Sequence, residues 1–345
     1  MQVTRSRLTV LLNALYDAGV DSIPVEHPSS DIGELVRIEL EDDGAATVRF
    51  TQGTYTYQDN REEIPVKHGE PAYDDLPDAE TYTRAVVASG LVDVENDSEI
   101  ASFFDRYGYA DLEAGHEPVV LGLDTNLVPW RLPETLGIDS ETGESDDKDR
   151  APTNGYALAT GVKEELDWHY KQYNTHELTA AFGDEFERLD EQPAGPNREG
   201  FLGLYEYRRL RTTRTVDIVN SETGDQEIVD AYREFNEDSR KTVLLLSNDY
   251  GFVDRAQEAG VPAHHVTYPV DLPRKAQGSW TDATELLYYL TILFGVLKLP
   301  KVTLYGVWND KDGRHWQHEE LDIDCRSPKV APQIERDLRI LSATD

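Results

Sequence analysis

Two apolar runs in the sequence are each followed closely by an acidic side chain, an arrangement that could deliver carboxylates for chemistry. The run VVLGL at residues 119–123 comes directly before Asp124, and the run TVLLL at residues 242–246 comes shortly before Asp249. Short apolar runs of this kind predict buried strands of a parallel sheet. Because α/β sheets bind ligands at the carboxyl ends of their strands, Asp124 and Asp249 are the first candidates for a functional site.

Two further acids stand near the starts of predicted helices. Glu165 lies in the first turns of one helix, just before Leu166, and Asp225 opens an amphipathic helix with the sequence DQEIVDAYREF. Hard divalent cations such as Mg²⁺ and Mn²⁺ prefer carboxylate oxygens, which three or four acids at one sheet edge would supply. Taken singly, Glu165 and Asp225 are more typical of helix caps or of acids that interact with the helix dipole.

Neighbouring acids leave the choice of ligands partly open. Glu164 could replace Glu165, since adjacent residues face different sides of a helix, although the following Leu166 favours Glu165. Three other acids are alternatives in the same region: Asp217 and Glu227 in place of Asp225, and Asp254 as a fifth carboxylate.

Four strings, in the order LGLDTNLV, VKEEL, GDQEIVDAY and LLLSNDYGFVDRAQEAGV, together resemble the PIN-domain family of metal-dependent nucleases. The resemblance covers roughly residues 118–270, with a longer gap than usual between the second and third acids, which implies extra helices there. It implies that four carboxylates bind Mg²⁺ or Mn²⁺, with Asn126 and Ser247 orienting them through hydrogen bonds. These carboxylates are Asp124, Glu165, Asp225 and Asp249.

The chemistry implied by this resemblance needs no nucleophilic side chain. Water activated by the bound metal would hydrolyse a phosphodiester bond of RNA and leave a 5′-phosphate and a 3′-hydroxyl. Two alternatives stay open: a structure-specific DNA nuclease, and a catalytically inactive scaffold that binds RNA or a protein. The presence of all four acids favours an enzyme, because like charges held together repel one another without a cation.

A stretch rich in arginine is the candidate for contact with RNA. Residues 205–214 read YEYRRLRTTR, in a chain that is otherwise strongly acidic. Arginine can hold phosphates in bidentate fashion and stack on bases. The alternative is a helix face that balances neighbouring acids through salt bridges. The arginines are Arg208, Arg209, Arg211 and Arg214.

Other motifs are weaker. The histidine pairs 264–265 and 315–318 lack enough further ligands for a zinc site. Residues 309–317 join two predicted strands, and Trp308 and Trp316, on either side of the loop NDKDGR, indicate hairpin packing and not a base-stacking platform. The sequence contains no phosphate-binding loop, no dinucleotide fingerprint and no Gly-x-Ser-x-Gly elbow.

The elements around these residues predict an α/β protein with three parts. Residues 118–270 alternate strands and helices, as in a parallel, Rossmann-like sheet. Residues 1–115 predict an α+β accessory domain, with a helix at 5–18, hairpin strands at 34–40 and 45–50, a further strand at 54–57, and helices at 79–89 and 98–107. This domain could bind substrate, mediate homo-oligomerisation or bind a protein partner. Residues 271–345 predict a helix at 281–297 and a hairpin, packed on the nuclease domain.

Composition places the chain in a broad class. Its 345 residues contain 67 Asp and Glu against 33 Lys and Arg, a formal net charge of -34, spread over a foldable chain with 39% hydrophobic residues. Dispersed acid of this kind is typical of proteins that work in molar salt, which screens their self-repulsion. The single Cys325 excludes a disulfide framework, and neither a signal peptide nor a membrane span is predicted. We therefore expect a halophilic, cytoplasmic protein that does not enter membranes.

Overall fold

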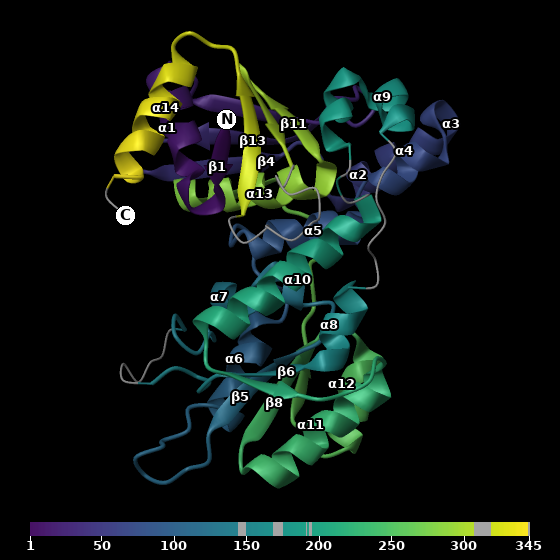
Figure 1. Cartoon of the computed structure of the whole chain (residues 1–345), viewed down its shortest axis with the longest axis vertical. Coiled ribbons are helices and arrows are strands. Elements are labelled where there is room, and N and C mark those ends of the chain that lie inside the picture. The colour runs from purple at the N-terminus through teal and green to yellow at the C-terminus, as the bar shows by residue number, and fades with distance from the viewer. Residues whose placement is uncertain (144–149, 168–174, 191, 193–194, 307–318, 344–345) are drawn as a thin grey trace. The chain divides into compact units, whose positions relative to one another are not determined.

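The computed structural model describes residues 1–143, 150–167, 175–190, 192, 195–306 and 319–343 (Figure 1). The chain divides into two compact units, each made from separate stretches of sequence. The first unit comprises Met1–Val92, Lys171–Arg198 and Val270–Asp345, and the second comprises Asp93–Tyr170 and Glu199–Pro269. The second unit is thus formed by two stretches inserted into the first.

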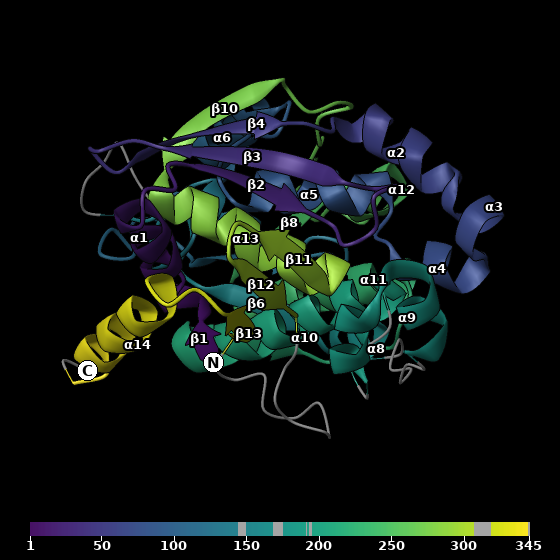
Figure 2. The same cartoon turned by 90° about the horizontal axis from the view of Figure 1, so that it is seen from above.

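The first unit is built on an antiparallel sheet whose order, among the described residues, is β1-β13-β12-β11-β2-β3-β4-β10. Figure 2 shows β10, β4, β3 and β2 side by side, so that strands from the two ends of the sequence meet in one sheet. Gln2 pairs with Asp322, Lys298 with Glu26, and Ser279 with Ala45. The strands are β1 (Gln2–Thr4), β2 (Ser22–Glu26), β3 (Glu34–Leu40), β4 (Ala45–Phe50), β10 (Lys275–Ser279), β11 (Val296–Leu299), β12 (Val302–Tyr305) and β13 (Glu320–Cys325).

Helix α13 (Trp280–Phe294) is the most apolar element of this unit, and its side chains are buried along most of its length. A capping box between Ser279 and Asp282 starts it, and Gly295, at φ 74°, ends it. Its Phe294 packs against Tyr57 and Tyr82 in an aromatic cluster. The other helices are η1 (Arg5–Arg7), α1 (Thr9–Asp17), α2 (Thr54–Glu62), α3 (Ile64–His68), α4 (Glu70–Asp75), α5 (Ala79–Ala88), α9 (His176–Phe182), η3 (Asp184–Leu189) and α14 (Val330–Leu341).

The predicted three-part division differs from this organisation. The strands after residue 270 pair with strands before residue 51, so the C-terminal segment belongs to the first unit and is not an extension of the second. The predicted boundary at 115 also shifts, because α6 (Asp97–Tyr107) belongs to the second unit. Backbone hydrogen bonds between distant strands decide the first point, and such pairing leaves no local signal in sequence.

Two local predictions in the first unit are wrong. Residues 54–57 lie in helix α2 and not in a strand, because Tyr57 turns inward and donates from its hydroxyl to the carbonyl of Pro77 at 2.7 Å. The predicted helix at 281–297 ends before Gly295, and the apolar residues that follow form β11. The hairpin of β3 and β4 has the predicted bounds.

The second unit confirms the predicted parallel α/β sheet. Its order is β7-β6-β5-β8-β9, and every described pair is parallel. The chain runs outward from β5 to β7 on one side and then crosses to β8 and β9 on the other, so the switch point lies between β5 and β8. The strands are β5 (Val119–Leu123), β6 (Tyr156–Ala159), β7 (Val216–Val219), β8 (Thr242–Ser247) and β9 (Ala263–His265).

Helices pack around this sheet. Gly122 in β5 allows a close approach, since a Cβ there would lie 2.4 Å from the Leu245 side chain and 3.2 Å from the Tyr232 ring of α11. The helices are α6, η2 (Val128–Trp130), α7 (Leu132–Thr135), α8 (Thr160–Asp167), α11 (Asp225–Ser239) and α12 (Tyr250–Glu258), with α10 (Gly195–Thr213) contributing its residues from Glu199 onward. Within the described ranges of the whole chain, no helix has the length and apolarity needed to cross a bilayer.

Candidate active site

The four predicted carboxylates lie in the second unit, on loops and helices that follow the carboxyl ends of its strands. Asp124 comes directly after β5, and Asp249 comes two residues after β8, on the other side of the switch point. Glu165 lies on α8, which begins directly after β6, and Asp225 is the first residue of α11. The sheet topology therefore gathers these residues at the edge where α/β folds bind ligands.

Asp124 is the buried member of the group, with only 4% of its surface exposed. Its Oδ2 accepts hydrogen bonds from Ser247 Oγ at 2.6 Å and Asn126 Nδ2 at 3.3 Å, and its Oδ1 accepts from the Thr125 N–H at 2.7 Å. Asn126 and Ser247 thus both donate hydrogen bonds to the Asp124 carboxylate.

The electrostatic environment of Asp124 links it to two of the other acids. Its pKa is raised to about 6, mainly by burial, with the negative charges of Asp225 and Glu165 adding to the effect. The hydrogen bonds from Ser247 and Thr125 act in the opposite direction. A raised pKa from burial plus nearby like charges is characteristic of functional sites.

Glu165 connects three parts of the site. One carboxylate oxygen accepts a hydrogen bond from the Thr125 hydroxyl, and the other accepts from the Gly224 N–H at 2.8 Å. Gly224, at φ 105°, immediately precedes α11 and Asp225. Glu164 is exposed, so Glu165 is the member of the pair that points toward Asp124.

Asp225 and Asp249 are more exposed and have other partners. Arg255 Nη1 donates to Asp225 Oδ2 at 2.6 Å. Asp249 caps α12 by accepting from the Gly251 N–H at 2.6 Å, and its own N–H donates to Ser247 Oγ at 2.9 Å. Of the alternative acids, Asp217 pairs with Lys241 at 2.5 Å, whereas Glu227 and Asp254 are exposed.

The donor chemistry suits a hard divalent cation, because carboxylate oxygens are the ligands that Mg²⁺ and Mn²⁺ prefer. The described part of the chain nevertheless has no group of three or more His, Cys, Asp or Glu side chains arranged to hold a metal. In this structure Glu165 accepts a hydrogen bond from Thr125, and Asp225 is paired with Arg255. Metal binding would exchange these contacts for metal ligands.

Comparison of the chain with protein-family models, with curated proteins and with solved structures gives no match.

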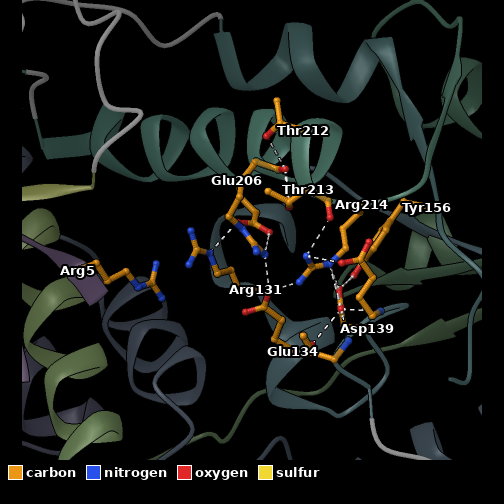
Figure 3. Close-up of polar contacts among 12 residues, drawn as sticks. Arg5, Arg131, Glu134, Asp139, Tyr156, Glu206, Thr212, Thr213 and Arg214 are labelled. Atoms are coloured by element: carbon orange, nitrogen blue, oxygen red, sulfur yellow. Dashed lines mark hydrogen bonds and ion pairs between the residues drawn. The ribbon is translucent and has the colours of Figure 1, made fainter. Parts of the chain in front are cut away.

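Two of the four candidate RNA-binding arginines are engaged in an internal ion-pair network, drawn in Figure 3. Arg209 bonds to Glu206 at 2.7 Å and Glu134 at 2.6 Å, and Arg214 bonds to Asp139 at 3.0 Å. Arg209 and Arg214 therefore form internal salt bridges with neighbouring acids, which is the alternative to RNA contact given above. Arg208 and Arg211 of the same helix are exposed.

Asp139 is the centre of this network and is fully buried. It accepts hydrogen bonds from Arg214 Nε and from the Tyr156 hydroxyl at 2.5 Å. Although burial raises the pKa of Asp139, the hydrogen bonds from Tyr156 and Arg214 outweigh it and hold that pKa at about 2. Figure 3 shows Tyr156 and Arg214 converging on this carboxylate. The network is therefore a buried structural element of the second unit.

The histidines at positions 264 and 265 point to opposite sides of β9, as successive strand residues do. The His264 ring stacks on Phe103, and the His265 ring stacks on Tyr250. This separation explains why the pair makes no joint metal site. The other pair, at 315 and 318, lies outside the described residues, as does the loop at 308–317.

Sequence reasoning missed the contacts of Thr125 with Glu165, of Tyr250 with His265 and of Arg255 with Asp225. Thr125 lies inside the LGLDTNLV string, so its proximity to the site could have been anticipated. Arg255 lies on α12 and reaches Asp225, 30 residues earlier in the chain. That contact depends on how α11 and α12 pack and could not be read from sequence.

Proposed function

We propose that the second unit is a metal-dependent nuclease that hydrolyses RNA, with Mg²⁺ or Mn²⁺ held by Asp124, Glu165, Asp225 and Asp249. One observation carries this proposal: Asp124 is buried at the switch point of a parallel sheet, and its pKa is raised by burial and by the charges of Glu165 and Asp225. A site that holds like charges together gains when a divalent cation binds them.

When bound, the metal would activate water for attack on the phosphorus and stabilise the leaving oxygen. The side chains of this unit orient the donors. Ser247 and the Thr125 N–H fix the Asp124 carboxylate, and Asn126 supports the same oxygen as Ser247. The Gly224 N–H holds Glu165 beside the start of α11. Such outer partners tune ligand orientation in metal sites.

A second candidate, a scaffold that binds RNA or protein without cutting, draws support from one observation. Arg255 neutralises Asp225 at 2.6 Å, and Thr125 and Gly224 satisfy both oxygens of Glu165. A non-catalytic unit could keep these contacts permanently.

The test is a cleavage assay in about 1 M KCl, the ionic strength that the acidic composition suggests. Labelled single-stranded RNA and DNA are incubated with Mn²⁺ or with EDTA. We expect the wild type to cut RNA with Mn²⁺ only, and Asp249→Asn, which keeps a capping side chain for α12, to lose that activity. Cutting of DNA alone would assign a DNA nuclease. Binding without cutting in every condition would leave the scaffold as the function.

Ser247→Ala is expected to reduce cleavage by roughly 10- to 100-fold, as the loss of an outer partner does in metal sites. The Ser247 hydroxyl donates to the Asp124 carboxylate and accepts from the Asp249 N–H, so its removal takes one hydrogen bond from the Asp124 side chain and one from the backbone of Asp249. Because its hydrogen bond lowers the pKa of Asp124, the acid limb of the pH–rate profile should move to higher pH. Ser247→Thr keeps the hydroxyl and serves as the control. An equal loss at every pH would argue against this role.

A further inference from the structure

An exposed aromatic ring lies at the edge of the candidate active site. Tyr250 is the first residue of α12 and directly follows Asp249. Its side chain is 65% exposed, although a tyrosine ring in a folded protein usually has most of its apolar surface covered. The ring is nonetheless held in place, because it stacks on His265 with centroids 3.6 Å apart and planes within 5°. One face of Tyr250 is thus covered by His265, and the exposure belongs to the rest of the ring.

The partner of Tyr250 is itself fixed. His265 Nε2 lies 3.0 Å from the carbonyl oxygen of Asn248, which can only accept, so this nitrogen carries a proton. The other ring nitrogen lies 3.2 Å from the Thr267 hydroxyl. Both imidazole nitrogens therefore have partners, and the histidine provides a rigid support for the tyrosine.

The sheet register connects this stack to the buried carboxylate. His265 pairs with Ser247 in the parallel ladder of β9 and β8, and Ser247 donates to Asp124. Strands β5 and β9 are separated by two inter-strand spacings, about 10 Å in all. The stack therefore lies at the same carboxyl edge of the sheet as the candidate carboxylates.

We propose that Tyr250 is a stacking platform for an unpaired nucleobase next to the scissile phosphate, an inference that rests on the proposed nuclease function. A flat aromatic ring supported from behind matches the face of a base, and such stacking is the usual way that proteins hold single strands. Bases inside a duplex have both faces covered by their neighbours. Single-stranded nucleic acid is therefore the substrate class that this residue selects.

The charge of the chain makes stacking important for binding. At a net charge of -34, long-range attraction of a polyanion cannot supply most of the affinity, and added salt weakens phosphate contacts further. Stacking does not depend on charge, so it persists under the conditions where ionic contacts fail. The exposed Arg208 and Arg211 could then add local contacts without carrying the affinity alone.

The experiment uses the full-length chain and fluorescently labelled single-stranded RNA in EDTA, so that binding is measured without cleavage. A single abasic residue is moved along the oligonucleotide, and each substrate is titrated with wild type, Tyr250→Ala and Tyr250→Phe. Tyr55→Ala, which removes a tyrosine that is 58% exposed on α2 in the first unit, is the matched control. Thermal melting of each variant confirms that it is folded.

We expect Tyr250→Ala to weaken binding by about 5- to 150-fold, the usual range for loss of one stacked base. Tyr250→Phe and Tyr55→Ala should bind as the wild type does. An abasic residue at one position should weaken the wild type by a similar factor and have no further effect on Tyr250→Ala. Failure of the wild type to bind, or an abasic penalty that survives unchanged in Tyr250→Ala, would overturn the stacking role.

The same substrates, with Mn²⁺ added, separate this inference from the proposed function. If the wild type binds RNA with a position-specific abasic effect that depends on Tyr250 but does not cut it, the stacking role stands and the nuclease function is rejected. Cutting by the wild type, with equal binding and cutting by Tyr250→Ala, would retain the nuclease and reject the platform.

Discussion

Asp124→Asn is expected to abolish cleavage while making the protein more stable at neutral pH. The pKa of Asp124 is raised from 3.8 to about 6 in the folded state. Above pH 6 the carboxylate is charged in both states, and this charge is less favourable in the folded state than in the unfolded chain, so it lowers the stability of the protein. A shift of that size corresponds to about 3 kcal/mol. The amide that replaces the carboxylate would place a donor toward either Ser247 or Thr125, which costs about 1 kcal/mol, so we expect a net gain of about 2 kcal/mol.

The sign of the pH dependence follows from the same shift. Between about pH 4 and pH 6 the folded state keeps a proton on Asp124 that the unfolded state has lost, so stability falls as the pH rises through this range. Urea unfolding at pH 7.5 should therefore show the gain for Asp124→Asn, and at pH 4 the gain should be absent. Asp249→Asn, at an exposed cap, should change stability little. A variant that is less stable than the wild type at pH 7.5 would contradict the argument.

Asp139→Ala is expected to destabilise the second unit by about 3–5 kcal/mol, the cost of leaving one partner of a buried ion pair alone. The substitution leaves the guanidinium of Arg214, only 8% exposed, and the Tyr156 hydroxyl without the carboxylate that both contact. Hydrogen exchange at the amides of β6 reports the second unit separately from the first. Arg211→Ala, at an exposed position on α10 three residues before Arg214, is the control and should stay within about 0.5 kcal/mol.

The pH dependence of this pair has the opposite direction from that of Asp124. The folded pKa of Asp139, about 2, lies below its ordinary value of 3.8, so its contribution is present above about pH 4 and is lost as the pH falls toward 2. The double variant Asp139→Leu with Arg214→Met should recover much of the stability, because apolar residues can replace a buried pair. If Asp139→Ala unfolds like the wild type, the network has no structural role.

The parts of the fold that sequence predicted are those whose signal is local. Alternation over residues 34–50 gave the hairpin of β3 and β4, and apolar runs gave β5 and β8 with their following acids. Short, half-exposed β7 has no such run and was missed. The sheet of the first unit was missed for a different reason, since β1 pairs with β13 across more than 300 residues of chain.

The candidate site divides in the same way. The position of each acid on its element could be predicted, because strand ends and helix starts have characteristic sequences. The hydrogen-bond and ion-pair partners of these acids could not be predicted. The ion pair of Arg255 with Asp225 and the ion pair of Arg214 with Asp139 depend on tertiary packing. These pairs decide which charged side chains remain available to bind a ligand. The arginine stretch illustrates this limit, because one short string supplies both ion-paired, partly buried cations and exposed ones.

The discontinuous first unit has a consequence for biosynthesis. Strands β1 to β4 are synthesised before the second unit, but Glu26 pairs with Lys298 and Gln2 with Asp322, so their sheet stays open until those later strands have been made. The parallel sheet of the second unit is complete at His265. Because nascent domains fold as units once their residues are available, the carboxylate edge can form while the antiparallel sheet still exposes unpaired strands. The early strands are therefore the part of the nascent chain most in need of protection from aggregation.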